Sequence, residues 1–136
     1  MGSSRSRPFD YSIDTAARLV SVRVEGILTF CTLVNYASSL RADPRFSPAF
    51  SEIVDLRGVE SVALGPRESI ILADHVDPFS FNARRAFVVE SQAQMRAAQL
   101  HRMLRRESKT MRVFFSMDEA WRWIECGEGS SAAAGV

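Results

Sequence analysis

The chain has 136 residues, of which 46% are hydrophobic and 24% are charged, and its formal net charge is +1. This composition is that of one ordinary folded domain, and it excludes a chain that is disordered throughout. The near-neutral charge gives no general attraction to nucleic acid, and no apolar run reaches the roughly 18 residues of a membrane span. We therefore expect a cytoplasmic protein without an integral membrane segment.

Alternating apolar side chains predict a hairpin at the start of the chain. The segments FDYSID at 9–14 and LVSVRVE at 19–25 both place apolar residues at every second position, which is typical of half-buried strands. The four residues between them form the predicted turn. Gly26 is expected to end the second strand.

A helix and a third strand are predicted next. Thr29 is a suitable N-cap for a helix that ends at Asp43, because a residue before proline is pushed out of the helical conformation. The segment FSEIVDL at 50–56 is typical of a strand, and Arg57-Gly58 is expected to turn the chain.

Helices and strands alternate through the rest of the chain. The remaining predicted elements are a short helix that includes residues 70–74 and ends before Pro78, a strand at 85–89, a long helix capped by Ser91, a strand at 112–115 and a final helix at 119–125. The apolar line of the long helix is expected at Ala93, Ala97, Leu100 and Leu104. The buried face of the final helix is expected at Ala120, Trp121 and Ile124.

This order predicts an α/β fold with a mixed five-stranded sheet that opens with a hairpin and has parallel later strands joined by crossovers. We expect a single domain over 8–126, with flexible tails at 1–7 and 127–136. Cys31 and Cys126 lie far apart without neighbouring histidines, so neither a disulfide nor a metal site is expected.

Five short segments stand in a recognisable order between residues 9 and 125. They are an opening Tyr-x-Ile-Asp strand, Val-x-Gly-x-Leu-Thr before the first helix, FSEIVDLRGV, Arg-Arg-Ala-Phe-Val and a closing VFFSMDEAWRWI. In this order they resemble the SpoIIAA-like branch of the STAS and CRAL-TRIO group of bacterial domains. The resemblance implies a mixed sheet flanked by helices. It also implies two functional classes, which are phospho-regulated interaction switches (anti-sigma-factor antagonists) and carriers of small lipids.

The phospho-switch pattern of the antagonists is only half present. The segment DLRGV at 55–59 matches the first half of the pattern, but Ala-Leu-Gly-Pro at 63–66 stands where Asp-Ser-Ser-Gly-Leu would carry the phosphorylated serine. Ser61 and Ser69 lie nearby and out of register. The sequence leaves open whether either serine is phosphorylated.

Two adjacent arginines begin the strand at 85–89. Neighbouring strand residues point to opposite faces, so one of Arg84 and Arg85 is expected to pair with a carboxylate such as Asp55 or Asp74, with anion binding as the alternative.

An aromatic loop precedes these arginines. Phe79 and Phe81 are expected to share one side of an extended segment and to contact a partner chain or a ligand. The complete set of candidate interaction or ligand residues is Arg57, Ser61, Ser69, Phe79, Phe81, Arg84, Arg85 and Met95.

No catalytic or metal-binding constellation is found. His75 lies near two aspartates, but no nucleophile accompanies it. Our leading hypothesis is a non-enzymatic STAS-like regulatory or protein-interaction module without a cofactor, acting as a homodimer or with a protein partner and not with nucleic acid. The alternative is a carrier of a small lipid-like or anionic ligand, with Phe79, Phe81 and the helix around Met95 gating a pocket. An apolar pocket of several hundred Å³ would favour the carrier, and a flat apolar patch would favour the interaction module.

Overall fold

The sheet has five strands in chain order in a computed structural model that describes residues 8–106 and 108–134. β1 is antiparallel to β2, and each later strand is parallel to its neighbour. The strands are β1 (Phe9–Asp14), β2 (Leu19–Thr29), β3 (Ser51–Ala63), β4 (Arg85–Val88) and β5 (Met111–Phe114). The predicted α/β class, opening hairpin and parallel later strands are confirmed.

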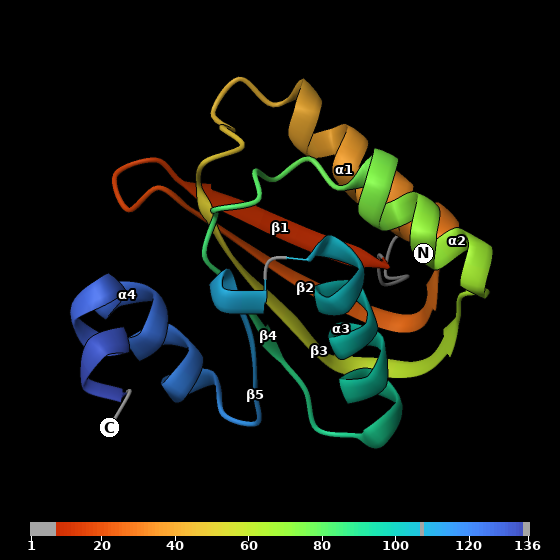
Figure 1. The fold of residues 1–136 in the computed structure, drawn as a ribbon. Coiled ribbons are helices and arrows are strands. Elements are labelled where there is room, and N and C mark those ends of the chain that lie inside the picture. The colour runs from red at the N-terminus through yellow and green to blue at the C-terminus, as the bar shows by residue number, and fades with distance from the viewer. Residues whose placement is uncertain (1–7, 107, 135–136) are drawn as a thin grey trace, which may run out of the picture.

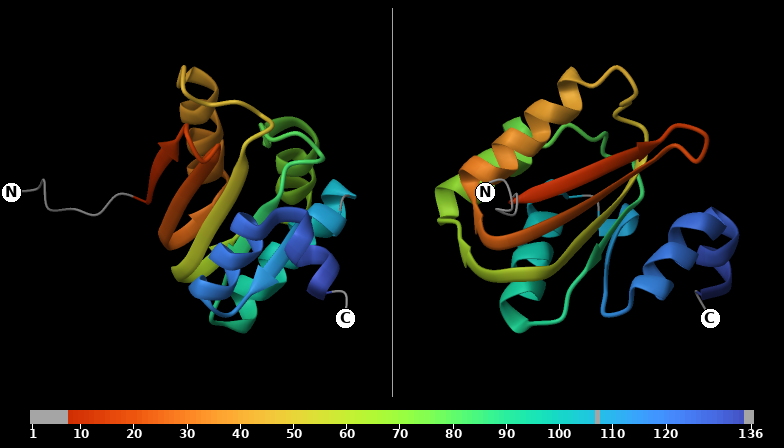
Figure 2. Two further views of the ribbon diagram at one scale, coloured as in Figure 1. Left: turned by 90° about the vertical axis from the view of Figure 1, so that its left-hand side faces the viewer. Right: turned by 180° about the vertical axis from the view of Figure 1, so that it is seen from behind.

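The helices cover both faces of this sheet, as Figures 1 and 2 show. They are α1 (Phe30–Ala42), α2 (Pro66–Ile71) with the π-helical turn η2 (Leu72–Val76), α3 (Gln92–Arg105), the 3-10 turn η3 (Ser108–Thr110) and α4 (Met117–Ala134). α1, α2 and α3 pack on one face, and α4 packs alone on the other. None of the helices in the described part of the chain is long and apolar enough to cross a membrane.

The backbone of α4 remains helical to Ala134, so this helix is longer than the predicted 119–125. The predicted tail at 1–7 and the last two residues of the predicted tail at 127–136 lie outside the described residues.

The alternation of side chains along the strands divides the core between the two faces. In β2, Val20, Val22 and Val24 point toward α1 and α3, whereas Leu19 joins the cluster under α4. All four residues of β4 are buried, because helices cover it on both sides. Phe87 and Ala86 therefore belong to opposite faces of the core.

Two predicted interruptions are wrong, because β2 and β3 run on through their glycines and stay paired as far as Thr29 and Ala63. The register shifts on either side of Gly26, whose φ of 77° is a conformation that glycine adopts readily and other residues rarely adopt. A side chain on Gly58 would place its Cβ 2.9 Å from Cγ of Glu25. The two glycines therefore allow a bulge in β2 and a close approach of β3 to β2, and neither glycine forms a turn.

The buried faces of the two later helices also differ from the prediction. On α3, Ala97 packs against the core as predicted, but Leu100 is 38% exposed, and the buried positions are Gln94, Ala98 and Arg105. On α4, Trp123 is 4% exposed and Trp121 is 36% exposed, so the wrong tryptophan was predicted to be buried.

Gln94 ties the start of α3 to β3. β4 pairs with β3 only from Glu52 to Asp55, and beyond that point Nε2 of Gln94 donates to the carbonyl oxygen of Val59 at 2.8 Å. Oε1 of the same side chain accepts from the backbone N–H of Glu90 at 2.7 Å. A buried amide therefore takes the place of a neighbouring strand.

Candidate ligand-binding cavity

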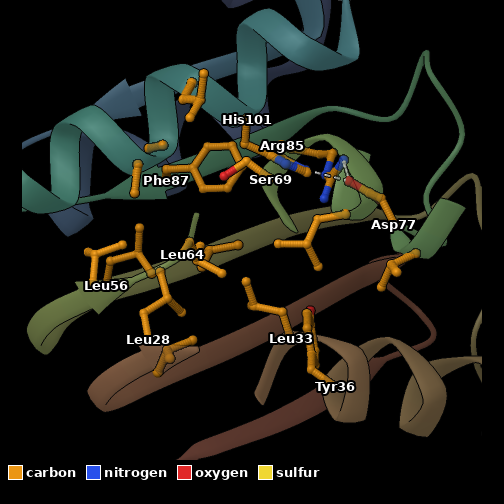
Figure 3. A pocket seen from close by; sticks show the side chains of 18 of the residues that line it. Leu28, Leu33, Tyr36, Leu56, Leu64, Ser69, Asp77, Arg85, Phe87 and His101 are labelled. Atoms are coloured by element: carbon orange, nitrogen blue, oxygen red, sulfur yellow. Dashed lines mark hydrogen bonds and ion pairs between the residues drawn. The ribbon is translucent and has the colours of Figure 1, made fainter. Parts of the chain in front are cut away.

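A cavity of about 360 Å³ lies between the sheet and the helices α1, α2 and α3. Its walls are mainly apolar, and Figure 3 shows Leu28, Leu56 and Leu64 at one end. Polar side chains gather at the opposite end, where Figure 3 shows Arg85 and Asp77. The cavity is therefore amphipathic along its length.

The π-helical turn η2 fixes Asp77 at the polar end. The backbone N–H of Asp77 donates to the carbonyl oxygen of Leu72 at 2.9 Å, five residues earlier. Oδ1 of Asp77 then accepts from the backbone N–H of Phe79 at 3.0 Å. Both contacts hold the carboxylate in one orientation.

Arg85 of β4 is the centre of a buried ion network. Its Nε donates to Oε1 of Glu52 at 2.9 Å, and its Nη1 donates to Oδ2 of Asp77 at 2.7 Å. The Tyr36 hydroxyl of α1 donates to the other oxygen of Glu52 at 2.6 Å. Nε2 of His101, from α3, lies 2.7 Å from Oδ2 of Asp77. Residues from α1, β3, β4 and α3 and the residue that follows η2 thus meet at one end of the cavity.

The network sets the ionisation of its members. Burial opposes ionisation of Asp77, but Arg85, His101 and Arg105 outweigh it and hold the pKa of this carboxyl well below its usual range. Burial, together with the charge and hydrogen bond of Glu52, raises the pKa of Tyr36 well above its usual value. Asp77 is therefore a carboxylate and Tyr36 a neutral phenol at neutral pH.

Arg105 is a second buried arginine beside Asp77. Its terminal nitrogens donate to the carbonyl oxygens of Ala73 at 3.1 Å and Phe79 at 2.6 Å, and its Nε lies 3.6 Å from Oδ2 of Asp77. Two guanidinium groups therefore balance the two buried carboxylates, Glu52 and Asp77.

The two adjacent arginines do lie on opposite faces. Arg85 is the buried one, but it pairs with Glu52 and Asp77, so the predicted partners Asp55 and Asp74 are wrong. Arg84 lies over the Trp123 ring, with its guanidinium carbon 4.2 Å from the ring centroid. Glu52 becomes a partner because it faces Arg85 in the register of β3 and β4, which separation along the chain does not reveal.

Phe79 and Phe81 do not share one side, because the segment after Phe79 turns, with the N–H of Ala83 donating to the carbonyl of Ser80. Phe79 is 4% exposed, lines the cavity and meets Phe46 edge to face. Phe81 is 57% exposed beneath the guanidinium of Arg105. The expectation of one shared aromatic surface is wrong.

The cavity brings together three of the candidate residues: Ser69, Phe79 and Arg85. The Ser69 hydroxyl donates to the carbonyl oxygen of Gly65 at 3.1 Å. Five candidates are not among the residues that line it: Arg57, Ser61, Phe81, Arg84 and Met95. Arg57 is exposed and pairs with Asp55, Ser61 is exposed, and Met95 packs against the core.

Sequence reasoning missed five polar residues of the cavity: Tyr36, Glu52, Asp77, Arg96 and His101. One of them left a signal in the sequence, because Glu52 occupies an inward position of β3, two residues before Val54. A carboxylate at such a position needs a buried partner.

No protein-family model and no curated protein matches the chain. The solved structures that are similar to it include the following two. One is an uncharacterised DUF3478-family protein with a SpoIIAA-like fold from Shewanella loihica PV-4, with 14% identity, a TM-score of 0.58 and coverage of 88% of this chain and 96% of that one. The other is an anti-sigma factor antagonist from Mycobacterium paratuberculosis, with 21% identity, a TM-score of 0.57 and coverage of 88% and 98%. The chain therefore has a SpoIIAA-like fold, as the resemblance predicted.

Proposed function

We propose that this protein is a non-enzymatic binding module that holds a small, largely apolar ligand between the sheet and α1, α2 and α3. The observation that carries the proposal is the cavity of about 360 Å³ with apolar walls. Its volume falls within the range of roughly 300–1,000 Å³ that is usual for ligand sites. A cavity of about 150 Å³ already binds benzene, so this one has room for about 14 non-hydrogen atoms.

The hydrogen bonds of the polar groups support binding without catalysis. The Ser69 hydroxyl donates to a backbone carbonyl and the Tyr36 hydroxyl donates to Glu52, so neither is hydrogen-bonded to a histidine that could take its proton. Arg85 and Asp77 neutralise each other. These groups support orienting a ligand and give no activated nucleophile.

Native mass spectrometry of the full chain, purified without organic solvent, tests the proposal, because a retained ligand adds a discrete mass. Ala97→Leu places a larger side chain on the α3 wall of the cavity, and we expect it to weaken binding of an added apolar probe such as decanol about tenfold or more. Gln99→Leu, at an exposed position of the same helix that does not line the cavity, is the matched control. Equal binding by both variants would count against the cavity as the site.

A regulatory protein-interaction module is the second candidate, because one of the similar solved structures is an anti-sigma factor antagonist. The buried Ser69 and the segment 63–66 argue against the usual phospho-switch as its control. Self-association stays a prediction, which sedimentation velocity of the full chain tests. A homodimer that survives Ala97→Leu would indicate that association does not depend on the cavity.

A further inference from the structure

We propose that the cavity selects an uncharged ligand with a carbonyl or hydroxyl oxygen as its head, held against Arg85; this inference rests on the proposed binding function. Arg85 uses Nε for Glu52 and Nη1 for Asp77. No hydrogen bond joins its second terminal nitrogen, Nη2, to any residue that the structure describes. Because Arg85 lines the cavity, Nη2 is a donor available to a ligand there.

The charges around Arg85 disfavour an ionised head. Glu52 and Asp77 both line the cavity within hydrogen-bonding distance of this guanidinium, so a carboxylate head would bring a third anion to a cation that already pairs with two. An ammonium head would face Arg85, with Arg105 directly behind Asp77. Adding an ion to a buried and already balanced network requires desolvation without a free partner of opposite charge.

An uncharged oxygen avoids both conflicts. A carbonyl or hydroxyl oxygen can accept from Nη2 of Arg85 without changing the charge of the network. The Tyr36 hydroxyl donates its hydrogen bond to Glu52, and its oxygen still has lone pairs that can accept from a donor such as a ligand hydroxyl. The polar end therefore offers one donor and one acceptor to a neutral head.

The opposite end of the cavity fixes the rest of the ligand. Leu28, Leu56 and Leu64 lie there, away from Arg85, as Figure 3 shows. A volume of about 360 Å³ accommodates a chain or ring system of about 14 non-hydrogen atoms. Medium-chain alcohols and ketones have this size and this distribution of polarity.

Arg96 of α3 offers the competing arrangement. It also lines the cavity but is exposed to solvent, so an anionic head could lie at this arginine with its tail inside. An exposed ion pair contributes little to binding because water screens it. The inference therefore places the head at Arg85, and a variant of Arg96 distinguishes the two positions.

Isothermal titration of the full chain at pH 8 with 1-decanol, 2-decanone and decanoate tests the inference. These probes share a ten-carbon chain, and only decanoate is charged. We expect the alcohol and the ketone to bind at least about tenfold more tightly than decanoate, because decanoate must bring its charge to the buried carboxylates. Arg85→Lys, which keeps the charge but loses the forked donors, should weaken the alcohol and the ketone about tenfold. Gln99→Leu, at an exposed position of α3 that does not line the cavity, should leave both unchanged.

The outcomes separate this inference from the proposed function. Decanoate that binds as tightly as decanol overturns the inference and leaves the binding function standing, and loss of that binding in Arg96→Gln would place the anion at Arg96. Failure of all three probes to bind would overturn both. If Arg85→Lys does not fold, the relative affinities of the three probes for the unaltered chain still show whether the cavity prefers an uncharged head.

Discussion

The two faces of the sheet use the same strands to build different interiors. The face under α4 is a compact apolar cluster that includes Leu19, Ala86 and Trp123. The face under α1, α2 and α3 holds the cavity and the buried ions around Arg85. Adjacent residues of β4, Arg85 and Ala86, supply one face each. The comparison indicates that one face is packed with apolar side chains, while the other contains buried charge and the cavity that we propose as a binding site.

The largest expected effect separates the two adjacent arginines. Arg85→Met removes the cation that Glu52 and Asp77 share, and breaking such a buried pair costs about 3–5 kcal/mol of the free energy of unfolding. Arg84→Met loses a ring contact and a hydrogen bond to Trp123, for which we expect about 1–2 kcal/mol. Urea unfolding at pH 7 measures both losses. Similar losses would mean that the buried ion network contributes no more to the free energy of unfolding than the half-buried contact of Arg84.

A matched pair of leucines on β2 compares the packing of the two faces. Leu19 is 3% exposed under α4, and Leu28 is 4% exposed in the cavity wall. Leu28 already lacks contacts on its cavity side, so its truncation removes fewer of them. We expect Leu19→Ala to cost about 4 kcal/mol and Leu28→Ala about 2 kcal/mol in urea unfolding. The reverse order would contradict the assignment of looser packing to the cavity face.

Acid should weaken the cavity face through Asp77. The pKa of this carboxyl is lower in the folded protein than its ordinary value of about 3.9, so its stabilisation is complete above that pH and is lost as the pH falls below about 4. We expect this loss to be about 2 kcal/mol. Asp77→Asn should be less stable at pH 7 and should depend less on pH between 5 and 3, as urea unfolding would measure.

Asp74→Asn is the control for this acid dependence, because Asp74 is exposed in the same turn. It should follow the unaltered chain at every pH. An Asp77→Asn variant that loses stability on acidification as steeply as the unaltered chain would show that other carboxylates cause the loss.

The smallest expected effect concerns Phe81. Its ring is 57% exposed, and its described ring contact is with the guanidinium of Arg105, so Phe81→Ala should cost less than about 1 kcal/mol in thermal or urea unfolding. Phe79→Ala, in the core beside Phe46, is the reference and should cost about 3–5 kcal/mol. A strongly destabilised Phe81→Ala would place this ring in the structural core instead of on the surface.

Local patterns in the sequence predict most of the fold. Alternation in β1 and β2, the Thr29 cap and the Ser91 cap depend on residues close together in the chain, and the structure confirms each of them. The positions at Gly26 and Gly58 were not predictable as bulges, because each glycine owes its role to the facing strand. A turn and a bulge have the same local signal.

The candidate site was less predictable because its contacts are distant in sequence. Arg85 was identified, but its partners Glu52 and Asp77 come from β3 and from the end of a π-helical turn. The π geometry that places Asp77 has no sequence pattern comparable to a helix cap. On α3, Gln94 and Arg105 occupy the inward stripe where apolar residues were expected, because hydrogen bonds at β3 and η2 satisfy them.

Gln94 has a consequence for the solubility of the protein. β3 extends beyond its pairing with β4, and an unpaired strand edge can recruit the backbone of another molecule and start aggregation. By donating to the carbonyl of Val59, the Gln94 amide occupies one of the acceptors that an incoming strand would use. The first turn of α3 thus covers part of this edge of β3 and leaves fewer acceptors there for intermolecular strand pairing.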